Sequence, residues 1–446
     1  MKERMVILGA GESGIGAALL AQQKKFDVFV SDGSLIKPVF KEELRLNEID
    51  FEEGMHTQDK IFNASLIVKS PGIPEKNELI KKLRKAKIEI ISEIEFAFRH
   101  KGYSKIIAIT GSNGKTTTTS MVYHICKEAG IDCALVGNIG YSFARQVAVE
   151  PKKIYVAEIS SFQLDDIKTF RPDIAILTNI TEDHLDRYEY KFENYIKSKF
   201  SVIKNQTHDD VFIYNADDEI TIQYLNNFLN RVKALPISMR KELPQGAYIQ
   251  NAEMHVKWQN EEMNMSVEDF AVKGKHNQYN TMAAGLSACV MGIRKEKIRD
   301  AVQTFETLEH RMEFVATIKG VDFINDSKAT NTNSTWYALE SMEKPIILIL
   351  GGVDKGNDYS FIKDLVKEKV KAIVCMGKDN TKIHEAFGKD VELIVNTESA
   401  VDAVQASFHF ADKGDVVLLS PACASFDLFK NYEDRGKQFK EAVKDL

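Results

Sequence analysis

A glycine loop carrying a lysine and two threonines, Gly111-Ser-Asn-Gly-Lys-Thr-Thr117, follows the apolar run at residues 105–110. Backbone N–H groups of such a loop can cradle phosphates, the lysine can reach terminal phosphates, and a threonine hydroxyl can bind Mg²⁺. The strict form of this motif has a glycine five positions before Gly114, where the chain has Ile109. We therefore predict a shortened phosphate-binding loop made by Gly111, Asn113, Gly114, Lys115, Thr116 and Thr117.

Two further polar side chains follow neighbouring apolar runs of the same region. Glu158 ends the run at residues 154–158, and His184 comes shortly after the run at residues 174–179. Strand ends of this kind meet at one edge of a parallel sheet, so both side chains can reach Lys115 and Thr116. Mg²⁺ prefers oxygen ligands, which makes Glu158 the natural ligand and His184 a less expected one.

A second glycine cluster, Gly9-Ala-Gly-Glu-Ser-Gly14, follows the first apolar run, and Asp32 ends the next one. This spacing is typical of a dinucleotide site, in which glycines allow close approach of phosphates and the acid accepts a ribose hydroxyl. Three interpretations stay open from these residues: an NAD or FAD site, a tightly packed turn, and a site for another nucleotide diphosphate. The turn Ser70-Pro-Gly72 ends another run beside the same edge.

Short β-branched runs alternate with longer amphipathic stretches, which predicts an α/β fold with mostly parallel sheets. Polar seams near residues 100–104 and 304–309 divide the chain into residues 1–101, 102–307 and 308–446. Residues 235–270 have a mixed pattern, and we expect a small antiparallel excursion of the middle domain there. The predicted strands are residues 5–8, 28–31, 66–69, 105–110, 154–158, 174–179, 323–325, 346–350, 372–376 and 416–420.

The composition is that of a folded protein with about three domains. The chain has 446 residues, of which 44% are apolar and 28% charged, and its net charge of -6 gives no global attraction for nucleic acid or an anionic membrane. The five cysteines are scattered without paired spacing, which argues against a disulfide framework and a structural zinc site. With no run of spanning length, we expect a protein of the reducing cytoplasm.

Taken together, these motifs resemble those of the Mur ligases, ATP-dependent amide-forming enzymes of peptidoglycan synthesis, over nearly the whole chain. The resemblance implies three domains: a Rossmann-like N-terminal domain, a P-loop-type central ATPase domain and a Rossmann-like C-terminal domain. The motifs that carry it include the loop at residues 110–116 and the segments at 136–140, 158–163, 179–187, 310–313, 325–331, 351–355 and 420–436. The last of these segments is the most specific.

The resemblance also implies roles for individual residues. ATP would be bound by the phosphate loop with Asn138, Asn277, Asn280, Arg311 and Asp326, although Asn277 and Asn280 could simply cap a helix. Mg²⁺, with two ions expected, would be held by Thr116, Glu158, His184 and Lys199. Composition alone makes Lys199 a solvated lysine, but it matches the family lysine that is carbamylated by carbon dioxide. The implied catalytic residues are Lys115, His184, Lys199 and Lys328.

The C-terminal motifs most resemble those of family members that add D-glutamate to UDP-N-acetylmuramoyl-L-alanine through an acyl phosphate. The UDP substrate would then contact Ser13, Gly14, Asp32, Ser70, Pro71, Gly72, Asn138 and His184. D-glutamate would contact Thr330, Lys355 and Ser425, near Phe426 and Tyr432. These last two stand where relatives often have leucine and phenylalanine, which leaves side-chain details of the pocket open.

We expect a monomer that binds neither nucleic acid nor membrane. Three other functions stay open: an NAD-dependent oxidoreductase, a generic P-loop NTPase or kinase, and a non-catalytic nucleotide-binding protein. Two phosphate-binding loops in separate domains weaken the oxidoreductase interpretation, because hydride transfer has no evident use for the second loop.

Overall fold

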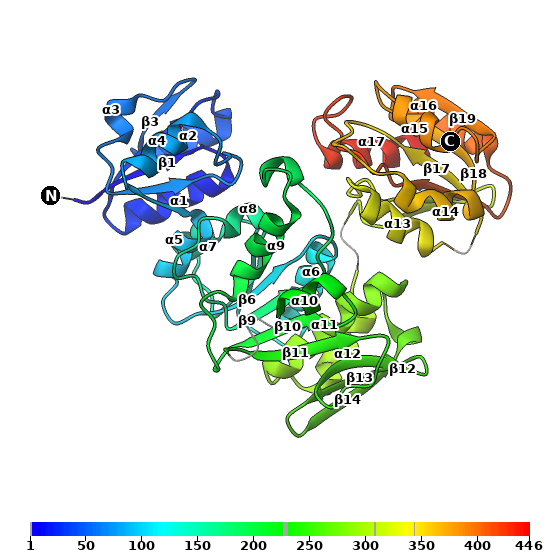
Figure 1. Ribbon diagram of the computed structural model, residues 1–446, viewed down its shortest axis with the longest axis horizontal. Coiled ribbons are helices and arrows are strands. Elements are labelled where there is room, and N and C mark those ends of the chain that lie inside the picture. The colour runs from blue at the N-terminus through cyan, green and yellow to red at the C-terminus, as the bar shows by residue number, and fades with distance from the viewer. Residues whose placement is uncertain (1, 226–230, 307–308, 343) are drawn as a thin grey trace. The chain divides into compact units, whose positions relative to one another are not determined.

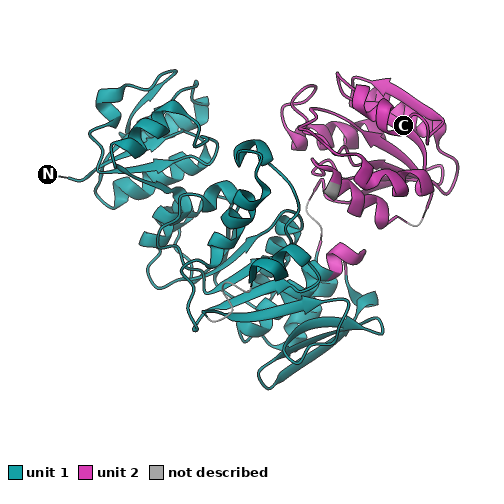
Figure 2. Cartoon of the chain, viewed as in Figure 1, with its two compact units in different colours: residues 1–270, 279–305 teal, residues 271–278, 306–446 magenta. Residues whose placement is uncertain are grey.

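The computed structural model describes residues 2–225, 231–306, 309–342 and 344–446, except for the side chain of Asn333. The chain forms two compact units, coloured separately in Figure 2. Unit 1 comprises Met1–Phe270 with Tyr279–Phe305, and unit 2 comprises Ala271–Gln278 with Glu306–Leu446. The predicted boundary between residues 307 and 308 lies outside the described residues. Unit 1 contains two of the three sheets, and unit 2 contains the third.

The first sheet has five parallel strands in the order β3-β2-β1-β4-β5 (Figure 1). Strands β1 and β4 are nearly continuous runs of buried residues, as expected for a parallel sheet with helices on both faces. The strand order reverses beside β1, and ligands bind at such switch points in open α/β sheets. The elements are β1 (Arg4–Leu8), α1 (Glu12–Gln23), β2 (Asp27–Asp32), α2 (Pro38–Leu46), β3 (Asp50–Glu53), α3 (Gln58–Ile61), β4 (Leu66–Lys69), α4 (Glu78–Lys85), β5 (Glu89–Ser92) and α5 (Glu93–His100).

The second sheet has nine strands in the order β14-β13-β12-β11-β10-β9-β6-β8-β7. Strand β6 lies between β8 and β9, so the loops that follow these three strands meet at one edge. The strands are β6 (Lys105–Thr110), β7 (Cys133–Gly137), β8 (Ile154–Glu158), β9 (Ile174–Leu177), β10 (Val211–Asn215), β11 (Lys233–Ser238), β12 (Gly246–Gln250), β13 (Glu253–Trp258) and β14 (Glu261–Ser266).

Helices of several lengths connect the strands of the second sheet or follow its last strand, β14. They are α6 (Lys115–Glu128), α7 (Phe143–Val149), α8 (Ser161–Leu164), η1 (Leu185–Arg187), α9 (Phe192–Phe200), η2 (Ser201–Ile203), α10 (Glu219–Leu225), η3 (Val267–Asp269), α11 (Lys275–Val290) and α12 (Lys295–Thr304). The helix predicted after the glycine loop, ending before Gly130, is confirmed as α6.

The predicted antiparallel excursion is confirmed in part. Strands β12, β13 and β14 form an antiparallel meander at one end of the second sheet. Residues 235–238 were expected to belong to it, but they continue β11, which pairs in parallel with both β10 and β12. The excursion therefore begins at β12.

The third sheet has six strands in the order β15-β16-β20-β17-β18-β19, all parallel except the hairpin of β15 and β16. Its strands are β15 (Glu313–Ile318), β16 (Val321–Asn325), β17 (Ile346–Leu350), β18 (Val370–Met376), β19 (Leu393–Thr397) and β20 (Val416–Leu419). Its helices are α13 (Thr332–Glu340), α14 (Ser360–Lys369), α15 (Thr381–Phe387), α16 (Ala400–Phe410) and α17 (Tyr432–Lys444).

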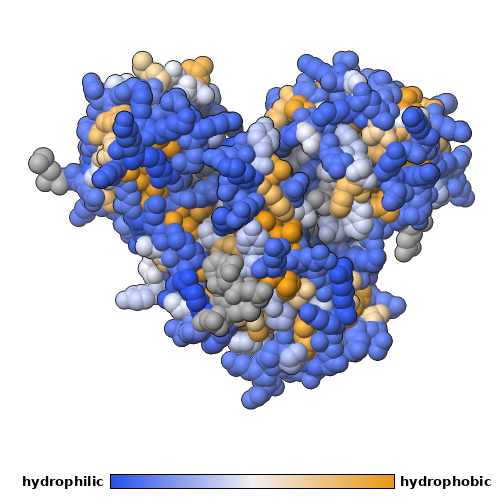
Figure 3. Space-filling view, viewed as in Figure 1, coloured by the Kyte–Doolittle hydropathy of each residue, from blue (hydrophilic) through white to orange (hydrophobic). Residues whose placement is uncertain are grey.

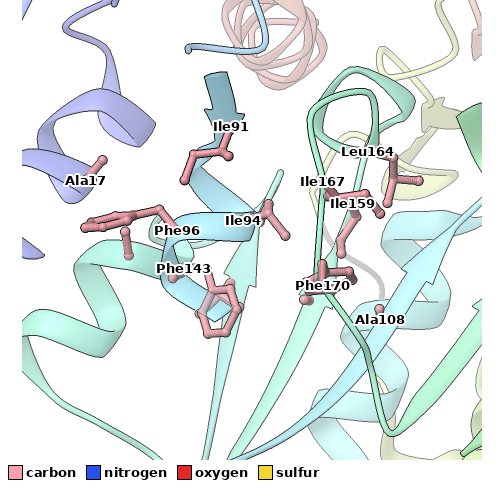
Figure 4. Packing of buried hydrophobic residues seen from close by; sticks show 14 of the residues in the cluster. Ala17, Ile91, Ile94, Phe96, Ala108, Phe143, Ile159, Leu164, Ile167 and Phe170 are labelled. Atoms are coloured by element: carbon pink, nitrogen blue, oxygen red, sulfur yellow. The ribbon is translucent and has the colours of Figure 1, made fainter. Parts of the chain in front are cut away.

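One hydrophobic core joins the first two sheets. Figure 4 shows Ala17 of α1 and Phe96 of α5 in the same buried cluster as Phe143 of α7. At the rim of this contact, the N–H of Ser142 and the guanidinium of Arg145 donate to the Glu12 carboxylate of α1. The third sheet has separate clusters on its two faces.

Polar residues dominate the face seen in Figure 3, with apolar residues scattered among them. Across the described ranges, the model contains no helix with the length and apolar character needed to cross a membrane. All five cysteines are free.

Candidate active site

The phosphate loop joins β6 to α6 with two glycines in left-handed backbone conformations. Gly111 has φ +144° and Gly114 has φ +78°. A Cβ atom on Gly111 would lie 2.0 Å from Thr178 Oγ1, and one on Gly114 would lie 2.4 Å from Asn280 Oδ1. Both positions therefore require glycine for space as well as for backbone geometry.

The lysine of this loop folds back over its own backbone. Lys115 Nζ donates to the carbonyl oxygens of Gly111 at 2.8 Å and Ser112 at 2.7 Å. Thr116 is buried in the first turn of α6, and Thr117 is half-buried. The N–H of Asn113 donates to Asn179 Oδ1 at 3.0 Å. Strand β9 ends at Leu177, two residues before the predicted end at Asn179.

Glu158 ends β8 with a buried carboxylate that is only half satisfied. Its side chain is 1% exposed, and Oε1 accepts a 2.7 Å hydrogen bond from Asn138 Nδ2. Among the described residues, no group hydrogen-bonds to Glu158 Oε2. A buried anionic oxygen without a partner is costly, and binding a cation would remove that cost.

Lys199 is buried under the phosphate loop and is not a solvated lysine. It lies on α9 with 2% exposure, and its Nζ donates to Gly111 O at 2.8 Å. Burial, and secondarily the charge of Lys115, lower the pKa of the Lys199 amine well below its ordinary value, against the opposite pull of Asp183 and Glu158. A neutral amine can act as a nucleophile, which a protonated lysine cannot.

His184 adopts a left-handed conformation, φ +54°, just before η1. Its Nε2 lies 3.6 Å from Asp183 Oδ2, and its ring centroid lies 5.0 Å from that of Phe162. In the described part of the chain, no three His, Cys, Asp or Glu side chains come together as a metal site. A site with the predicted ligands would therefore draw also on the Thr116 hydroxyl.

The predicted adenine-side asparagines have different surroundings. Asn280 Oδ1 accepts from Thr118 Oγ1 at 3.1 Å and lies against Gly114, so Asn280 belongs to the phosphate loop region. Asn277 Nδ2 donates to Lys273 O at 2.8 Å. The N–H groups of Asn277 and Gln278, in the first turn of α11, donate to Gly274 O at 3.0 and 3.1 Å.

The first glycine cluster is a tight turn supported by Asp32. A Cβ atom on Gly14 would lie 1.9 Å from Gly9 O, as expected for close packing of α1 on the loop. The Asp32 carboxylate accepts from the backbone N–H groups of Ala10 at 2.7 Å and Ser34 at 2.8 Å. Asp32 therefore fixes the loop itself, which sequence spacing did not predict.

The turn at residues 70–72 lies beside this loop. A Cβ on Gly9 would be 2.7 Å from Ser70 Cβ, so the ends of β1 and β4 are in contact. Ser13, Ser70 and Pro71 are half-buried, and Gly72 is exposed. The structure thus brings together the predicted UDP-site residues of the first sheet.

Lys328, Asp326 and Tyr432 lie at the carboxyl edge of the third sheet. The Lys328 ammonium lies 3.8 Å from the centre of the Tyr432 ring and donates to its hydroxyl. Asp326 accepts from Ser420 Oγ at 3.0 Å, and burial raises the pKa of its carboxyl to about 7 against the opposing effect of Ser420 and Arg311. Thr330, two positions after Lys328 in the sequence, is half-buried.

The loops after β17 and β20 pair through their backbones. Val353 N–H donates to Ala424 O at 2.8 Å, and Ala424 N–H donates to Val353 O at 3.2 Å. This pairing brings the Lys355 loop beside Ser425, which is buried, and Phe426, which is 71% exposed. Lys355 itself is exposed.

Several residues of the site were missed from sequence. Tyr195 OH lies 3.0 Å from Ser112 Oγ, and Arg187 stacks on Phe162 at 4.3 Å. Arg435 is fully buried and donates to Ser327 Oγ, Ser327 O and Cys423 O. Arg187, Phe162 and Arg435 lay within motifs that the sequence had singled out, whereas Tyr195 did not.

Three family models match this chain along most of its length. They describe a "Mur ligase MurD-like, N-terminal domain" over residues 3–92, a "Mur ligase middle domain" over residues 109–288, and a "Mur ligase, glutamate ligase domain" over residues 310–423. The chain is 53% identical to a UDP-N-acetylmuramoylalanine--D-glutamate ligase of Christiangramia forsetii, and 52% identical to the one of Bacteroides fragilis. Each alignment covers 100% of both proteins.

Solved structures with little sequence similarity have the same fold. The MurC ligase of Thermotoga maritima superposes with a TM-score of 0.62 at 17% identity, over 99% of each chain. The MurF ligase of Thermotoga maritima, solved in complex with ADP, superposes with a TM-score of 0.61 at 13% identity, over 100% of this chain and 98% of the other. The predicted α/β fold with three domains and mostly parallel sheets is thereby confirmed.

Proposed function

The chain belongs to the Mur ligase family of ATP-dependent ligases, and from this premise we propose that it joins D-glutamate to UDP-N-acetylmuramoyl-L-alanine, with release of ADP and phosphate. The relatives named UDP-N-acetylmuramoylalanine--D-glutamate ligase are about 50% identical to the chain over its full length. The observation that carries the proposal is the sheet edge where Lys115 and Lys199 both donate to Gly111 O. Such an edge can bind a nucleotide triphosphate and compensate its charge.

The reaction needs activation of a carboxylate, because oxide is a poor leaving group at neutral pH. Transfer of the ATP γ-phosphoryl group to the carboxylate of UDP-N-acetylmuramoyl-L-alanine gives an acyl phosphate. The amine of D-glutamate then attacks the acyl carbon, and phosphate leaves from the tetrahedral intermediate. Lys115 would leave its loop carbonyls to meet the transferred phosphoryl group, since phosphoryl transfer depends mainly on positioning and charge compensation.

Magnesium fits the residues at this edge. Glu158 offers a buried carboxylate oxygen without a hydrogen-bond partner among the described residues, and Thr116 offers a hydroxyl. Mg²⁺ bound there would neutralise phosphate charge, with two ions expected and His184 as a further ligand. Lys199, whose amine pKa is depressed by burial, would supply an additional oxygen ligand after reaction of its neutral amine with carbon dioxide to a carbamate.

Each domain would bind one ligand. Residues 1–101 would bind the UDP part of the substrate, through Ser13, Gly14, Asp32 and the turn at residues 70–72. Residues 102–307 would bind ATP and magnesium. Residues 308–446 would bind D-glutamate, whose two carboxylates suit the cation and hydroxyl donors Thr330, Lys355 and Ser425.

Lys328 lies in the same third sheet, where it would compensate charge together with Arg311. Asp326, whose pKa is near neutrality, could exchange a proton with the incoming amine. We place the monomeric enzyme in the cytoplasm, where ATP and UDP-linked precursors are available.

Phosphate release tests this function directly. We expect release only when ATP, Mg²⁺, UDP-N-acetylmuramoyl-L-alanine and D-glutamate are all present, and no response to NADH. Release with L-lysine or diaminopimelate in place of D-glutamate would point to a different ligase of the family. Release independent of any amino acid would refute the ligase proposal in favour of a generic NTPase.

A further inference from the structure

Arg187 connects the central sheet to the turn that follows β4. Its guanidinium donates to the carbonyl oxygens of Pro71, at 3.0 Å, and Gly72, at 3.4 Å. These residues lie more than a hundred positions from Arg187 in sequence, and both were predicted to contact the UDP substrate. Arg187 is thus a central-domain residue that holds part of the proposed substrate site.

The hydrogen bond to Pro71 O fixes the direction of a backbone donor. In a trans peptide the C=O and N–H groups point in opposite directions, so holding Pro71 O directs the Gly72 N–H away from Arg187. No described protein group accepts this N–H, and Gly72 is exposed. Arg187 therefore presents a free backbone donor on the side of the turn where a ligand can reach it.

The other neighbour of Arg187 is the ring of Phe162. The guanidinium carbon lies 4.3 Å from the ring centre, a distance typical of a cation–π contact. The ring centroid of Phe162 lies 5.0 Å from that of His184, and His184 directly precedes the short helix that Arg187 ends. Phe162 thus contacts both the arginine and the histidine assigned to the reacting end of the substrate.

We propose that Arg187 and Phe162 form a positioning bridge that couples the UDP-binding turn to His184. The bridge fixes the distance between the two places where one long substrate would be held, its nucleotide end and its reacting carboxylate. This proposal rests on the function proposed above and adds to it two specificity-determining residues that touch neither ATP nor the amino acid. Arg187 acts through the turn and through Phe162, so it is a positioning residue.

A separate anchor keeps the turn folded without Arg187. Lys69 Nζ donates to Ile73 O at 3.0 Å and pairs with the buried carboxylate of Asp166 at 3.0 Å. The N–H of Ile73 also closes the turn on Ser70 O at 3.1 Å. Loss of Arg187 should therefore shift the turn without unfolding it.

The test is direct binding of each substrate to purified full-length variants. For Arg187→Met, which keeps the length of the side chain, we expect the Kd for UDP-N-acetylmuramoyl-L-alanine to rise about tenfold, equivalent to about 1.4 kcal/mol. The Kd for ATP should stay within about twofold of wild type, which also reports that the phosphate loop is folded. Arg187→Lys should recover part of the affinity, because an ammonium can reach one carbonyl but not two.

The matched control is Lys191→Met, which removes an exposed cation from the same loop. Among the described residues, Lys191 forms an ion pair with the neighbouring Glu189, at 3.1 Å, and its loss should change neither Kd. In steady state, Arg187→Met should raise KM for the UDP substrate more than it lowers kcat. If Arg187 had only a structural role, its loss would instead weaken the binding of ATP and of the UDP substrate together.

A double-mutant cycle tests the bridge itself. Phe162→Leu should weaken UDP-substrate binding by a few-fold, and Phe162→Leu with Arg187→Met should weaken it by less than the product of the two single effects. Multiplicative effects, or an Arg187→Met protein that binds the UDP substrate as tightly as wild type, would overturn the bridge while leaving the ligase function intact. A wild-type protein that binds no UDP substrate would overturn both.

Discussion

Replacing Gly114 by alanine should destabilise the protein in two ways, whereas the same replacement at Gly130 should do so in one. The two glycines flank α6, with φ +78° and +74° respectively. Alanine in this left-handed conformation costs about 1–2 kcal/mol at either position. The chain therefore supplies its own control for backbone strain.

The difference between the two sites is the space around the new Cβ atom. At Gly130 no described atom lies within 4 Å of it, whereas at Gly114 it would lie 2.4 Å from Asn280 Oδ1. Asn280 would have to move, and its buried hydrogen bond from Thr118 Oγ1 would be lost at a cost of about 1 kcal/mol. Gly114→Ala should thus lower stability by about 2–3 kcal/mol in total, when this loss is added to the backbone strain.

Thermal unfolding and ATP titration together separate the two effects. With about 2–4 °C per kcal/mol in a domain of this size, Gly130→Ala should lower Tm by a few degrees and Gly114→Ala by more. Gly114→Ala should weaken ATP binding at least about tenfold, since the cradle and Asn280 are both displaced, while Gly130→Ala should leave it unchanged. Equal ATP affinities in the two variants would refute the reasoning that close approach of Asn280 shapes the cradle.

The remaining predictions concern three buried charged groups. Lys199→Arg should lower the rate of phosphate release at least about 100-fold, because arginine cannot form a carbamate and places a fixed cation under the loop. Lys197→Arg, which replaces an exposed lysine on the same helix, should keep the wild-type rate. Glu158→Gln should raise the Mg²⁺ concentration for half-maximal activity by about 10–100-fold, since the orphaned anionic oxygen is removed, and an unchanged requirement would contradict a metal role. For Glu95, burial raises the pKa of the carboxyl, but hydrogen bonds from Thr169, Lys168 and Arg99 outweigh the effect of burial and lower the pKa below its ordinary value of 4.5. The ionised carboxylate therefore stabilises the fold above pH 4.5, and this stabilisation is lost as the pH falls below that value. Glu95→Gln should therefore lower Tm at pH 7, with a gap to wild type that narrows on acidification, and a gap independent of pH would show that the charge is not involved.

The features that local sequence controls could be predicted well. The glycine loop after β6, the helix after it and the end of that helix before Gly130 depend on residues adjacent in the chain, and the positions of all three are confirmed. Glu158 was placed at a strand end for the same reason. The alternation of β-branched runs with helices was enough to predict mostly parallel sheets, although β3, β5, β7, β10, β15 and β19 were not among the predicted strands.

What sequence could not show depends on contacts between distant segments. The burial of Lys199 follows from packing of α9 beneath the phosphate loop, and composition alone made it a solvated lysine. The contact of Arg187 with Pro71 and the embedding of Arg435 beneath Ser327 likewise join segments about a hundred residues apart. Asp32 was recognised as an acid at a strand end, but the sequence could not show that its carboxylate accepts a hydrogen bond from the N–H of Ala10.

The hydrophobic core shared by the first two sheets limits how this chain can be divided. A fragment ending after residue 101 would expose to water the faces of α1 and α5 that pack on Phe143 and its neighbours, and aggregation would be expected. A chimera that exchanges the N-terminal region between relatives would need to carry α7 with it. The N-terminal region proposed to bind the UDP substrate is therefore not an independent folding module, and a shortened protein made for inhibitor screening should extend through the second sheet.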